Sequence, residues 1–183
     1  MKVLGICGSP RKGNTEQMLK WVLDSCVKGN VRTETILLRE LNIGHCTGCE
    51  VCYGTGRPCT INDDMEGLIG KMIESDAIII ATPNYFTNVS GLMKQFFDRN
   101  NPLCDPPLLK GKISAFLCVG AQPVDKWGDF LEKIYLNYSK GMGMVNVGSV
   151  IAKAEDPGEI ANNEEVQLSC TNLGNLILDR LGH

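Results

Sequence analysis

Strand-like and helix-like segments alternate along this chain, and the alternation is what most constrains its fold. Asp76–Thr82 is an almost continuous apolar run, as expected of a strand that is buried on both faces of a sheet. Other segments carry apolar residues at helical spacing, for example Met65, Leu68 and Met72. Five such strands alternating with five helices predict an α/β fold, with one parallel sheet between two layers of helices. The predicted strands are Val3–Cys7, Arg32–Leu38, Asp76–Thr82, Ile113–Val119 and Met144–Ala152.

Two of the predicted helices carry capping residues at their starts. Asp63 stands three residues before Glu66, which is the spacing of a capping box. Asn88 precedes the helical pattern that ends at Phe97 and is expected to cap that helix. These residues predict helices that begin close to positions 63 and 88.

The segment Gly8–Thr15 (GSPRKGNT) connects the first predicted strand to the first predicted helix. Its backbone N–H groups and the N-terminus of the helix can donate hydrogen bonds to an anion, and Arg11 and Lys12 add positive charge. The Walker A pattern is not met, because Asn14 stands where that loop has its lysine, and the pattern G-x-G-x-x-G is absent. The loop therefore predicts a site for a phosphate such as a mononucleotide presents. The alternative is an ordinary turn that Asn14 caps.

Length and composition limit the remaining classes of protein. A chain of 183 residues is long enough for one domain with a full core, and we expect residues 1–183 to form one. A net charge of −3 does not favour nucleic acid or an anionic membrane surface as a partner. No apolar run approaches the roughly 20 residues that span a bilayer, and the first apolar stretch ends too early for a signal peptide. Nine cysteines in such a chain are expected to be reduced thiols in the cytoplasm.

Two further loops are expected beside Gly8–Thr15, because the carboxyl ends of parallel strands meet at one edge of a sheet. Thr82–Asn88 follows the third predicted strand and combines a proline, an asparagine amide and two aromatic rings. Gly120–Pro123 follows the fourth predicted strand. Aromatic surface next to polar groups suits a planar ring whose phosphate lies in the first loop. The alternative is that Tyr85 and Phe86 only cover the core.

With these segments together, the chain resembles the flavodoxin-like NAD(P)H-dependent FMN reductases. The resemblance lies in Gly8–Thr15, Thr82–Phe86 and Ser90–Arg99 (SGLMKQFFDR), covers most of the chain to about Val119, and fades in the last third. It implies a flavodoxin-like three-layer α/β/α fold, a five-stranded parallel sheet in the order 2-1-3-4-5, bound FMN, and a homodimer or homotetramer. The residues that it implies for FMN are Ser9, Arg11, Lys12, Gly13, Asn14, Thr15, Pro83, Asn84, Tyr85, Phe86 and Gly120.

The longest irregular stretch, from about residue 41 to 62, carries four cysteines in the spacing C-x2-C-x2-C-x6-C. The four thiols, Cys46, Cys49, Cys52 and Cys59, can converge on one metal centre, since nearby glycines let the backbone wrap closely. A compact run of three cysteines is typical of an iron–sulfur cluster, whereas structural zinc sites usually come as two separated pairs. Cys59, after a gap of six residues, is the weakest match to the ferredoxin spacing. Zinc, free thiols and a labile disulfide are the alternatives.

The other five cysteines need a separate explanation. Cys7, Cys26 and Cys118 fall within apolar segments, where cysteine behaves as a small hydrophobic residue. The sequence assigns no role to Cys104 or Cys170.

Within the same family, the iron–sulfur flavoproteins carry such a motif in this loop, and the chain is similar to them. The similarity implies a 4Fe-4S cluster that exchanges electrons with FMN, and a ferredoxin-like electron donor. Because the flavin carries the redox chemistry, no catalytic acid or base is required. His45 and His183 are expected to be surface residues.

Three hypotheses follow for the function. The first is an FMN-dependent oxidoreductase or electron-transfer flavoprotein with the 4Fe-4S cluster. The second is a cluster-free, NAD(P)H-dependent reductase of FMN, a quinone or a similar small acceptor. The third is a non-enzymatic electron carrier that binds FMN and holds zinc in its cysteine loop.

Overall fold

Five parallel strands form the central sheet in a computed structural model that describes residues 1–182. They are β1 (Lys2–Cys7), β2 (Arg32–Leu37), β3 (Ala77–Tyr85), β5 (Ile113–Gly120) and β6 (Val145–Lys153). They lie in the order β2-β1-β3-β5-β6. Numbered among themselves, the parallel strands follow 2-1-3-4-5, so the predicted order is confirmed. His183 lies outside the described residues.

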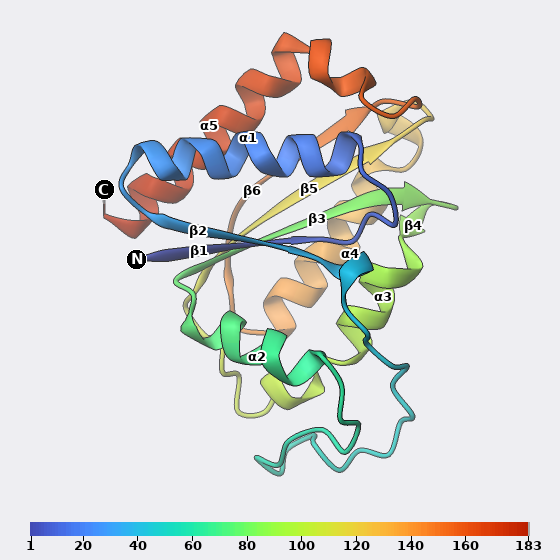
Figure 1. Ribbon diagram of the computed structural model, residues 1–183, viewed down its shortest axis with the longest axis vertical. Coiled ribbons are helices and arrows are strands. Elements are labelled where there is room, and N and C mark those ends of the chain that lie inside the picture. Colours follow the sequence, from blue (N-terminus) through green and yellow to red (C-terminus); the bar gives the residue numbers. More distant parts are fainter. Residues whose placement is uncertain (183) are drawn as a thin grey trace.

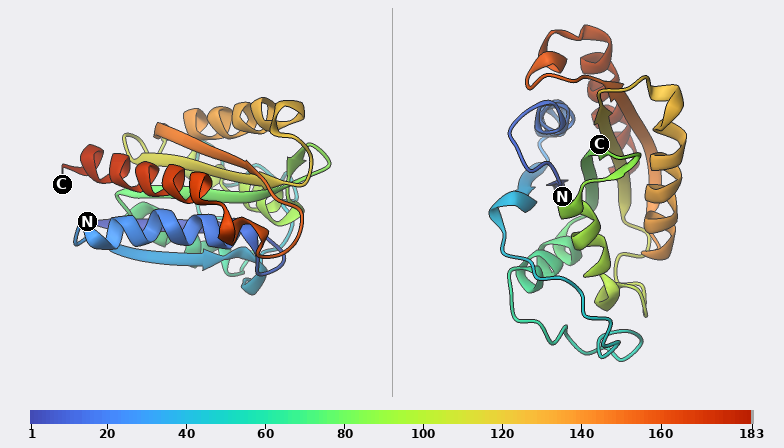
Figure 2. Two further views of the ribbon diagram at one scale, coloured as in Figure 1. Left: turned by 90° about the horizontal axis from the view of Figure 1, so that it is seen from above. Right: turned by 90° about the vertical axis from the view of Figure 1, so that its right-hand side faces the viewer.

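Helices cover both faces of this sheet, as predicted (Figure 1). One face carries α1 (Asn14–Lys28) and α5 (Glu164–Leu181), which lie side by side in the left view of Figure 2. The other face carries α2 (Met65–Glu74), α3 (Gly91–Asp98) and α4 (Gly128–Gly141). No helix within residues 1–182 is both long and apolar enough to cross a membrane.

The sheet separates two hydrophobic cores. Successive side chains of a strand point to opposite faces, so β3 contributes to both cores. Ile79 and Ala81 pack on the side of α1 and α5, while Ile78 and Ile80 pack on the side of the other helices. All four side chains are fully buried, which is why β3 reads as a continuous apolar run rather than an alternating one.

The start of α3 differs from the prediction. Asn88 and Val89 form the short strand β4 (Asn88–Val89), which pairs antiparallel with the end of β3. Ser90 caps the helix instead, because its Oγ accepts a hydrogen bond from Met93 N at 3.1 Å. The prediction for Asn88 was wrong because the chain folds back into a hairpin before the helix begins.

The start of α2 also differs from the predicted capping box. Oδ1 of Asp63 accepts a hydrogen bond from Met65 N at 3.0 Å. The carboxylate is otherwise bound to Arg99 and to the backbone N–H of Gly44, at 2.6 and 2.7 Å from Oδ2. Asp63 therefore supports the start of the helix and also joins it to two other segments.

Candidate functional site

The loop between β1 and α1 is fixed at the carboxyl edge of the sheet. Gly8 N donates to Ala81 O at 2.8 Å, and Ser90 Oγ donates to Gly8 O at 2.5 Å. A Cβ at position 8 would lie 2.8 Å from Met93 Cβ, which explains why a glycine stands there. These contacts hold the loop against the end of β3 and the start of α3.

Donors for an anion converge at the N-terminus of α1. No side chain of the described residues caps this helix, so the backbone N–H groups of its first turn are available to a ligand. The buried Ser9 hydroxyl donates to Arg11 O at 2.6 Å and accepts from Arg11 N at 3.3 Å, which bends the loop into a compact turn. Thr15 is buried at the same end of the helix. The loop thus forms a cradle of N–H and O–H groups.

A cavity of about 110 Å³ lies over this helix end, between the loops that follow β1, β3, β5 and β6. Pockets that enclose a whole small-molecule ligand are larger, roughly 300–1,000 Å³. The cavity has room for one end of such a ligand, and the rest would lie outside over the exposed loops. Its lining residues are Ser9, Arg11, Gly13, Asn14, Thr15, Pro83, Asn84, Tyr85, Val119, Gly120, Ala121, Ala154, Glu155 and Pro157.

The structure brings together most of the residues predicted for the cofactor. Lys12 and Phe86 are the exceptions, since neither lines the cavity. Ala121 belongs to the predicted loop Gly120–Pro123, but the sequence did not indicate the wall formed by Ala154, Glu155 and Pro157. The turn Asp156–Gly158 after the last strand, at the same edge of the sheet, is the signal that could have revealed it.

This last wall is joined to the phosphate loop by the Asn14 side chain. Asn14 Nδ2 donates to Asp156 O at 2.8 Å, while Asn14 Oδ1 accepts from Gly158 N at 2.9 Å and from Ile160 N at 3.2 Å. The Arg11 guanidinium also donates to Glu155 O, at 3.4 Å. Segments more than 140 residues apart in sequence therefore close one side of the cavity together.

Asn84 presents an unpaired polar atom at the opposite side. Its Oδ1 is buried and has no hydrogen-bond partner among the described residues. Gly120 lies directly against it, since a Cβ there would be 2.8 Å from Asn84 Cβ and 3.0 Å from Trp127 Cζ2. Buried polar groups normally have a hydrogen-bond partner, so Asn84 Oδ1 is a candidate acceptor for a ligand donor such as a heterocyclic N–H.

The β3–β4 hairpin carries aromatic surface to the mouth of the cavity. Tyr85 is 41% exposed and Phe86 is fully exposed. Phe86 and Thr87 adopt positive φ angles of 50° and 56°, a conformation that is strained for residues with bulky or β-branched side chains. A fully exposed ring does not cover the core, so that alternative does not hold for Phe86.

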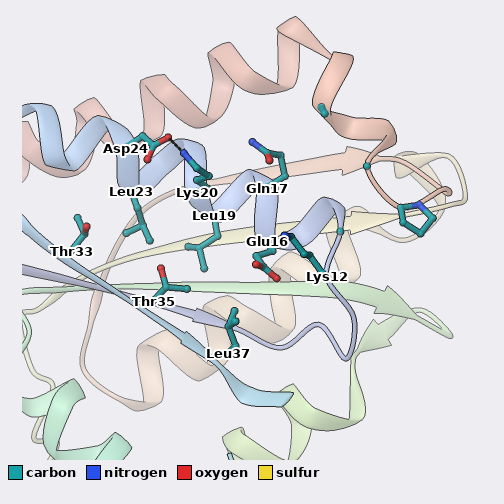
Figure 3. A pocket seen from close by; sticks show the side chains of 14 residues that line it. Lys12, Glu16, Gln17, Leu19, Lys20, Leu23, Asp24, Thr33, Thr35 and Leu37 are labelled. Atoms are coloured by element: carbon teal, nitrogen blue, oxygen red, sulfur yellow. Dashed lines mark hydrogen bonds and ion pairs between the residues drawn. The ribbon is translucent and has the colours of Figure 1, made fainter. Parts of the chain in front are cut away.

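A second, larger groove of about 860 Å³ runs between α1 and the edge strand β2 (Figure 3). Lys12 lines the end of this groove nearest to the phosphate loop, and Leu19, Leu23 and Leu37 supply apolar surface. The groove also holds carboxylates, among them Asp24, which is paired with Lys20 at 2.5 Å. Its mixed charge does not favour a phosphate.

The cysteine loop, residues 41–64, leaves the carboxyl end of β2 and extends below α2 and α3 (Figure 1). The right view of Figure 2 shows it at the same end of the molecule. His45 is exposed, as predicted. Among residues 1–182, no three His, Cys, Asp or Glu side chains are grouped closely enough to hold one metal ion. Of the four thiols, Cys46 and Cys49 are exposed, Cys59 is half-buried and Cys52 is buried.

Two of these thiols are perturbed in opposite directions. Hydrogen bonds from the backbone N–H of Val51 and from the hydroxyl of Thr60 lower the pKa of Cys49. Burial and then the charge of Cys59 raise the pKa of Cys52. The sulfur atoms therefore lie near enough to influence one another. Several thiols on one glycine-rich loop are the donors that an iron–sulfur cluster takes, so the donor set fits that group.

Arg99 is the residue at this loop that the sequence did not single out. It is 2% exposed, and its Nη2 lies 3.5 Å from Cys59 Sγ. The hydrogen bonds to Asp63 raise the pKa of Arg99. Burial alone would raise the pKa of Asp63, but the Arg99 guanidinium and the N–H of Gly44 outweigh it, so that this pKa is lowered. Both groups are therefore charged at neutral pH.

The remaining five cysteines are chemically different. Burial raises the pKa of Cys7 and Cys26 to about 11 and that of Cys170 to about 12, which keeps these thiols protonated. Cys104 is half-buried, and its Sγ donates to Asn100 O at 3.6 Å. Four cysteines lie in the two cores, as predicted for the first three: Cys7, Cys26, Cys118 and Cys170.

Known proteins are similar in sequence to this chain over most of its length. A family profile described as NADPH-dependent FMN reductase matches residues 1–155. An iron-sulfur flavoprotein of Archaeoglobus fulgidus is 35% identical over 167 residues, which cover 90% of this chain and 74% of that protein. An iron-sulfur flavoprotein of Methanocaldococcus jannaschii is 32% identical over 190 residues, which cover 98% of this chain and 96% of that protein.

Solved structures share the fold. An NAD(P)H:quinone oxidoreductase from Methanothermobacter marburgensis superposes with a TM-score of 0.78 at 14% identity, covering 95% of this chain and 94% of that one. A flavodoxin from the domain Archaea superposes with a TM-score of 0.64 at 17% identity over the whole of both chains. These likenesses show the fold alone, and they confirm that it is flavodoxin-like.

Proposed function

The chain belongs to the NADPH-dependent FMN reductase family, and from this premise we propose that the cavity at the carboxyl edge of its sheet holds FMN for an oxidoreductase reaction. One observation carries the proposal. Ser9, Arg11 and Thr15 meet the uncapped N-terminus of α1 in one cavity, with the unpaired Asn84 Oδ1 at its other side. An anion-binding end and a hydrogen-bonding end are what the two halves of FMN require.

The phosphate of FMN would lie at the anion-binding end. The Thr15 hydroxyl and the first N–H groups of α1 would donate to its oxygens, and the Arg11 guanidinium would offset its charge. The Ser9 hydroxyl would join them by turning from Arg11 O, to which it donates in the structure. Asn14 supports this end indirectly, since its side chain holds the segment from Asp156 to Ile160 against the loop. Lys12 lines the neighbouring groove and makes a smaller contribution.

The flavin ring would lie across the mouth of the cavity. Pro83, Asn84 and Tyr85 line one side and Gly120 the other, where a side chain would collide with Asn84. A bound flavin supplies hydride and single-electron transfer by itself, so the protein has to bind it, orient it and control access to it. The hairpin side chains Tyr85 and Phe86 are exposed, so a second substrate could reach the flavin ring from their side.

The electron donor in this family is a nicotinamide nucleotide, as its description states. We place the nicotinamide ring at the open approach beside Tyr85, where two flat rings can stack. The acceptor would be a small molecule such as a quinone or free flavin, which reaches the ring by the same approach. In this arrangement donor and acceptor use the site in turn.

The cysteine loop would add a 4Fe-4S cluster, held by Cys46, Cys49, Cys52 and Cys59, and a ferredoxin-like protein would be a further donor. Two features support this assignment: the relatives in Archaeoglobus and Methanocaldococcus are iron-sulfur flavoproteins, and the four thiols share one loop, which follows β2 along the chain. The cluster would exchange electrons with FMN one at a time.

A second candidate is the same reductase without a cluster. It is favoured by the spread of the four thiols, since no three metal-binding side chains are grouped among residues 1–182. For either candidate we place the protein in the cytoplasm as a homodimer or homotetramer. The nine free thiols support the cytoplasmic placement.

Purification without oxygen tests these proposals. The visible spectrum, the FMN content and an assay for iron and acid-labile sulfide are measured on the same sample, followed by NADPH oxidation. The first candidate predicts a brown protein with FMN, about four iron atoms per chain and matching sulfide. A yellow protein without iron that oxidises NADPH would establish the second. A protein that retains no FMN and does not take it up would contradict both.

A further inference from the structure

Arg99 and Asp63 form a buried ion pair at the base of the cysteine loop. Arg99 Nη1 lies 2.6 Å from Asp63 Oδ2, and Arg99 Nη2 lies 3.0 Å from Asp63 Oδ1, so the ion pair is bidentate. The side chains are only 1% and 5% exposed. Arg99 comes immediately after α3 and Asp63 shortly before α2, and neither lines the cavity proposed for FMN.

The same two side chains reach both ends of the loop. At the entry, Arg99 Nη1 donates to Gly44 O at 2.7 Å, and Asp63 Oδ2 accepts from Gly44 N at 2.7 Å. At the exit, Arg99 Nη2 donates to Ile61 O and to Cys59 Sγ, each at 3.5 Å. The ion pair therefore closes the base of the loop and brings one sulfur atom to a fixed position.

A buried ion pair is an energetically expensive way to anchor a loop. Burying two charges carries a desolvation penalty that the attraction between them often fails to offset. Arg99 Nε is moreover buried without a hydrogen-bond partner among the described residues. The feature specific to arginine here is the planar fork, which binds a carboxylate on one side and still points one N–H at sulfur.

We propose that Arg99 is a positioning residue for Cys59, which it holds as the fourth sulfur ligand of an iron–sulfur centre in this loop. The inference rests on the proposed centre. It also identifies why a cysteine six residues beyond the others can serve: Arg99 and Asp63 draw the exit of the loop back to its entry. A positive charge beside the sulfur also favours the more negatively charged, reduced centre.

The test compares Arg99→Gln, Arg99→Lys and Asp63→Asn with the unchanged protein. Arg57→Gln is the matched control, since Arg57 is an exposed cation in the same loop. After purification without oxygen, three quantities are measured: iron per FMN, the reduction potential of the iron centre, and the rate at which iodoacetamide modifies Cys59 in metal-free protein. FMN content reports whether each variant is folded.

Arg99→Gln is expected to contain less iron per FMN, and the iron centre that remains should have a more negative reduction potential. Iodoacetamide should modify Cys59 of this variant about tenfold faster or more, because the base of the loop opens. Arg99→Lys retains the charge but loses the fork. It should keep the potential close to that of the unchanged protein while its Cys59 reacts faster. Arg57→Gln should match the unchanged protein in all three quantities.

Unchanged iron, potential and Cys59 reactivity in Arg99→Gln would overturn the inference while leaving the proposed centre intact. If the unchanged protein itself carries no iron, the proposed centre fails, and the Cys59 rate in metal-free protein still decides whether Arg99 positions that side chain. Should Arg99→Gln not fold, Arg99→Lys and Asp63→Asn decide by the same rate. If Cys59 is modified as slowly in Arg99→Lys and Asp63→Asn as in the unchanged protein, the proposed role of the Arg99–Asp63 pair is contradicted.

Discussion

Arg11 and Lys12 are adjacent in the chain but serve different surfaces of the protein. Arg11 lines the cavity at the carboxyl edge and donates to Glu155 O, whereas Lys12 lines the groove along β2. The hydrogen bonds between Ser9 and Arg11 hold this part of the loop in a compact turn. The sequence shows two cations but not this division, because it depends on the path of the backbone.

We therefore expect Arg11→Ala to weaken FMN binding by about 1–3 kcal/mol, which is a dissociation constant roughly 5- to 150-fold higher. The reason is the loss of a charge-assisted hydrogen bond to the phosphate. Titration of metal-free apoprotein with FMN, followed by flavin fluorescence, measures the constant. Lys12→Ala is the control and should change it much less. Equal losses in the two variants would show that only general positive charge matters.

The cysteines are predicted to react very unequally. The lowered pKa of Cys49 means that its thiolate appears at a lower pH than that of an ordinary cysteine. The core thiols Cys7, Cys26 and Cys170 have pKa values of about 11 to 12 and stay protonated. In metal-free protein at about pH 7, iodoacetamide should modify Cys49 first and the core thiols only after unfolding. Mass spectrometry at several pH values gives the rates. Core thiols that react as fast as Cys49 would refute the distinction.

At the scale of elements, the five parallel strands, the covering helices and the phosphate loop could be predicted, because their signals are local. Apolar runs such as Asp76–Thr82 and the composition of Gly8–Thr15 are readable without neighbours. The hairpin β4 and the wall at residues 154–157 could not be predicted. The first depends on antiparallel pairing, and the second on hydrogen bonds from Asn14 across more than 140 residues.

The cysteine loop should lose its metal when one thiol is removed. Cys49→Ser is expected to abolish iron binding while FMN content stays the same, because the loop does not line the cavity proposed for FMN. Cys104→Ser is the control, since Cys104 lies outside the loop. Iron and FMN are assayed after purification without oxygen. Unchanged iron in Cys49→Ser would argue against the ligand assignment, and so would iron loss in Cys104→Ser.

The contact between α1 and α5 depends on one small residue. A Cβ on Gly174 would lie 2.6 Å from Ser25 Cβ and 2.7 Å from the Val22 carbonyl oxygen, so the helices must move apart. Gly174→Ala should lower the free energy of unfolding by about 1–3 kcal/mol.

Gly70→Ala in α2 is the matched control for this substitution. Its Cβ would meet nothing within 4 Å, and it should raise the free energy of unfolding by about 0.5–1 kcal/mol. Urea denaturation of both variants gives the two values. Equal stability in the two variants would mean that the helices adjust at no cost.

At the scale of the whole molecule, the sheet brings four loops from distant parts of the chain to one edge. The order β2-β1-β3-β5-β6 places the ends of β1 and β3 side by side, so that the anion-binding turn lies next to the hairpin with its aromatic rings. The cavity suited to FMN lies at this edge. The loop of four thiols begins after β2, and the Arg99–Asp63 pair fastens it at the C-terminal end of α3. The family places this arrangement among flavin-dependent oxidoreductases.

The most direct measurement compares how tightly the flavin-free protein binds FMN and riboflavin, which differ only in the phosphate. Titration followed by flavin fluorescence gives both dissociation constants. If Gly8–Thr15 and the start of α1 hold the phosphate, FMN should bind at least about 100-fold more tightly, since several charge-assisted hydrogen bonds are lost with riboflavin. Equal affinities, or no binding of either flavin, would contradict the account.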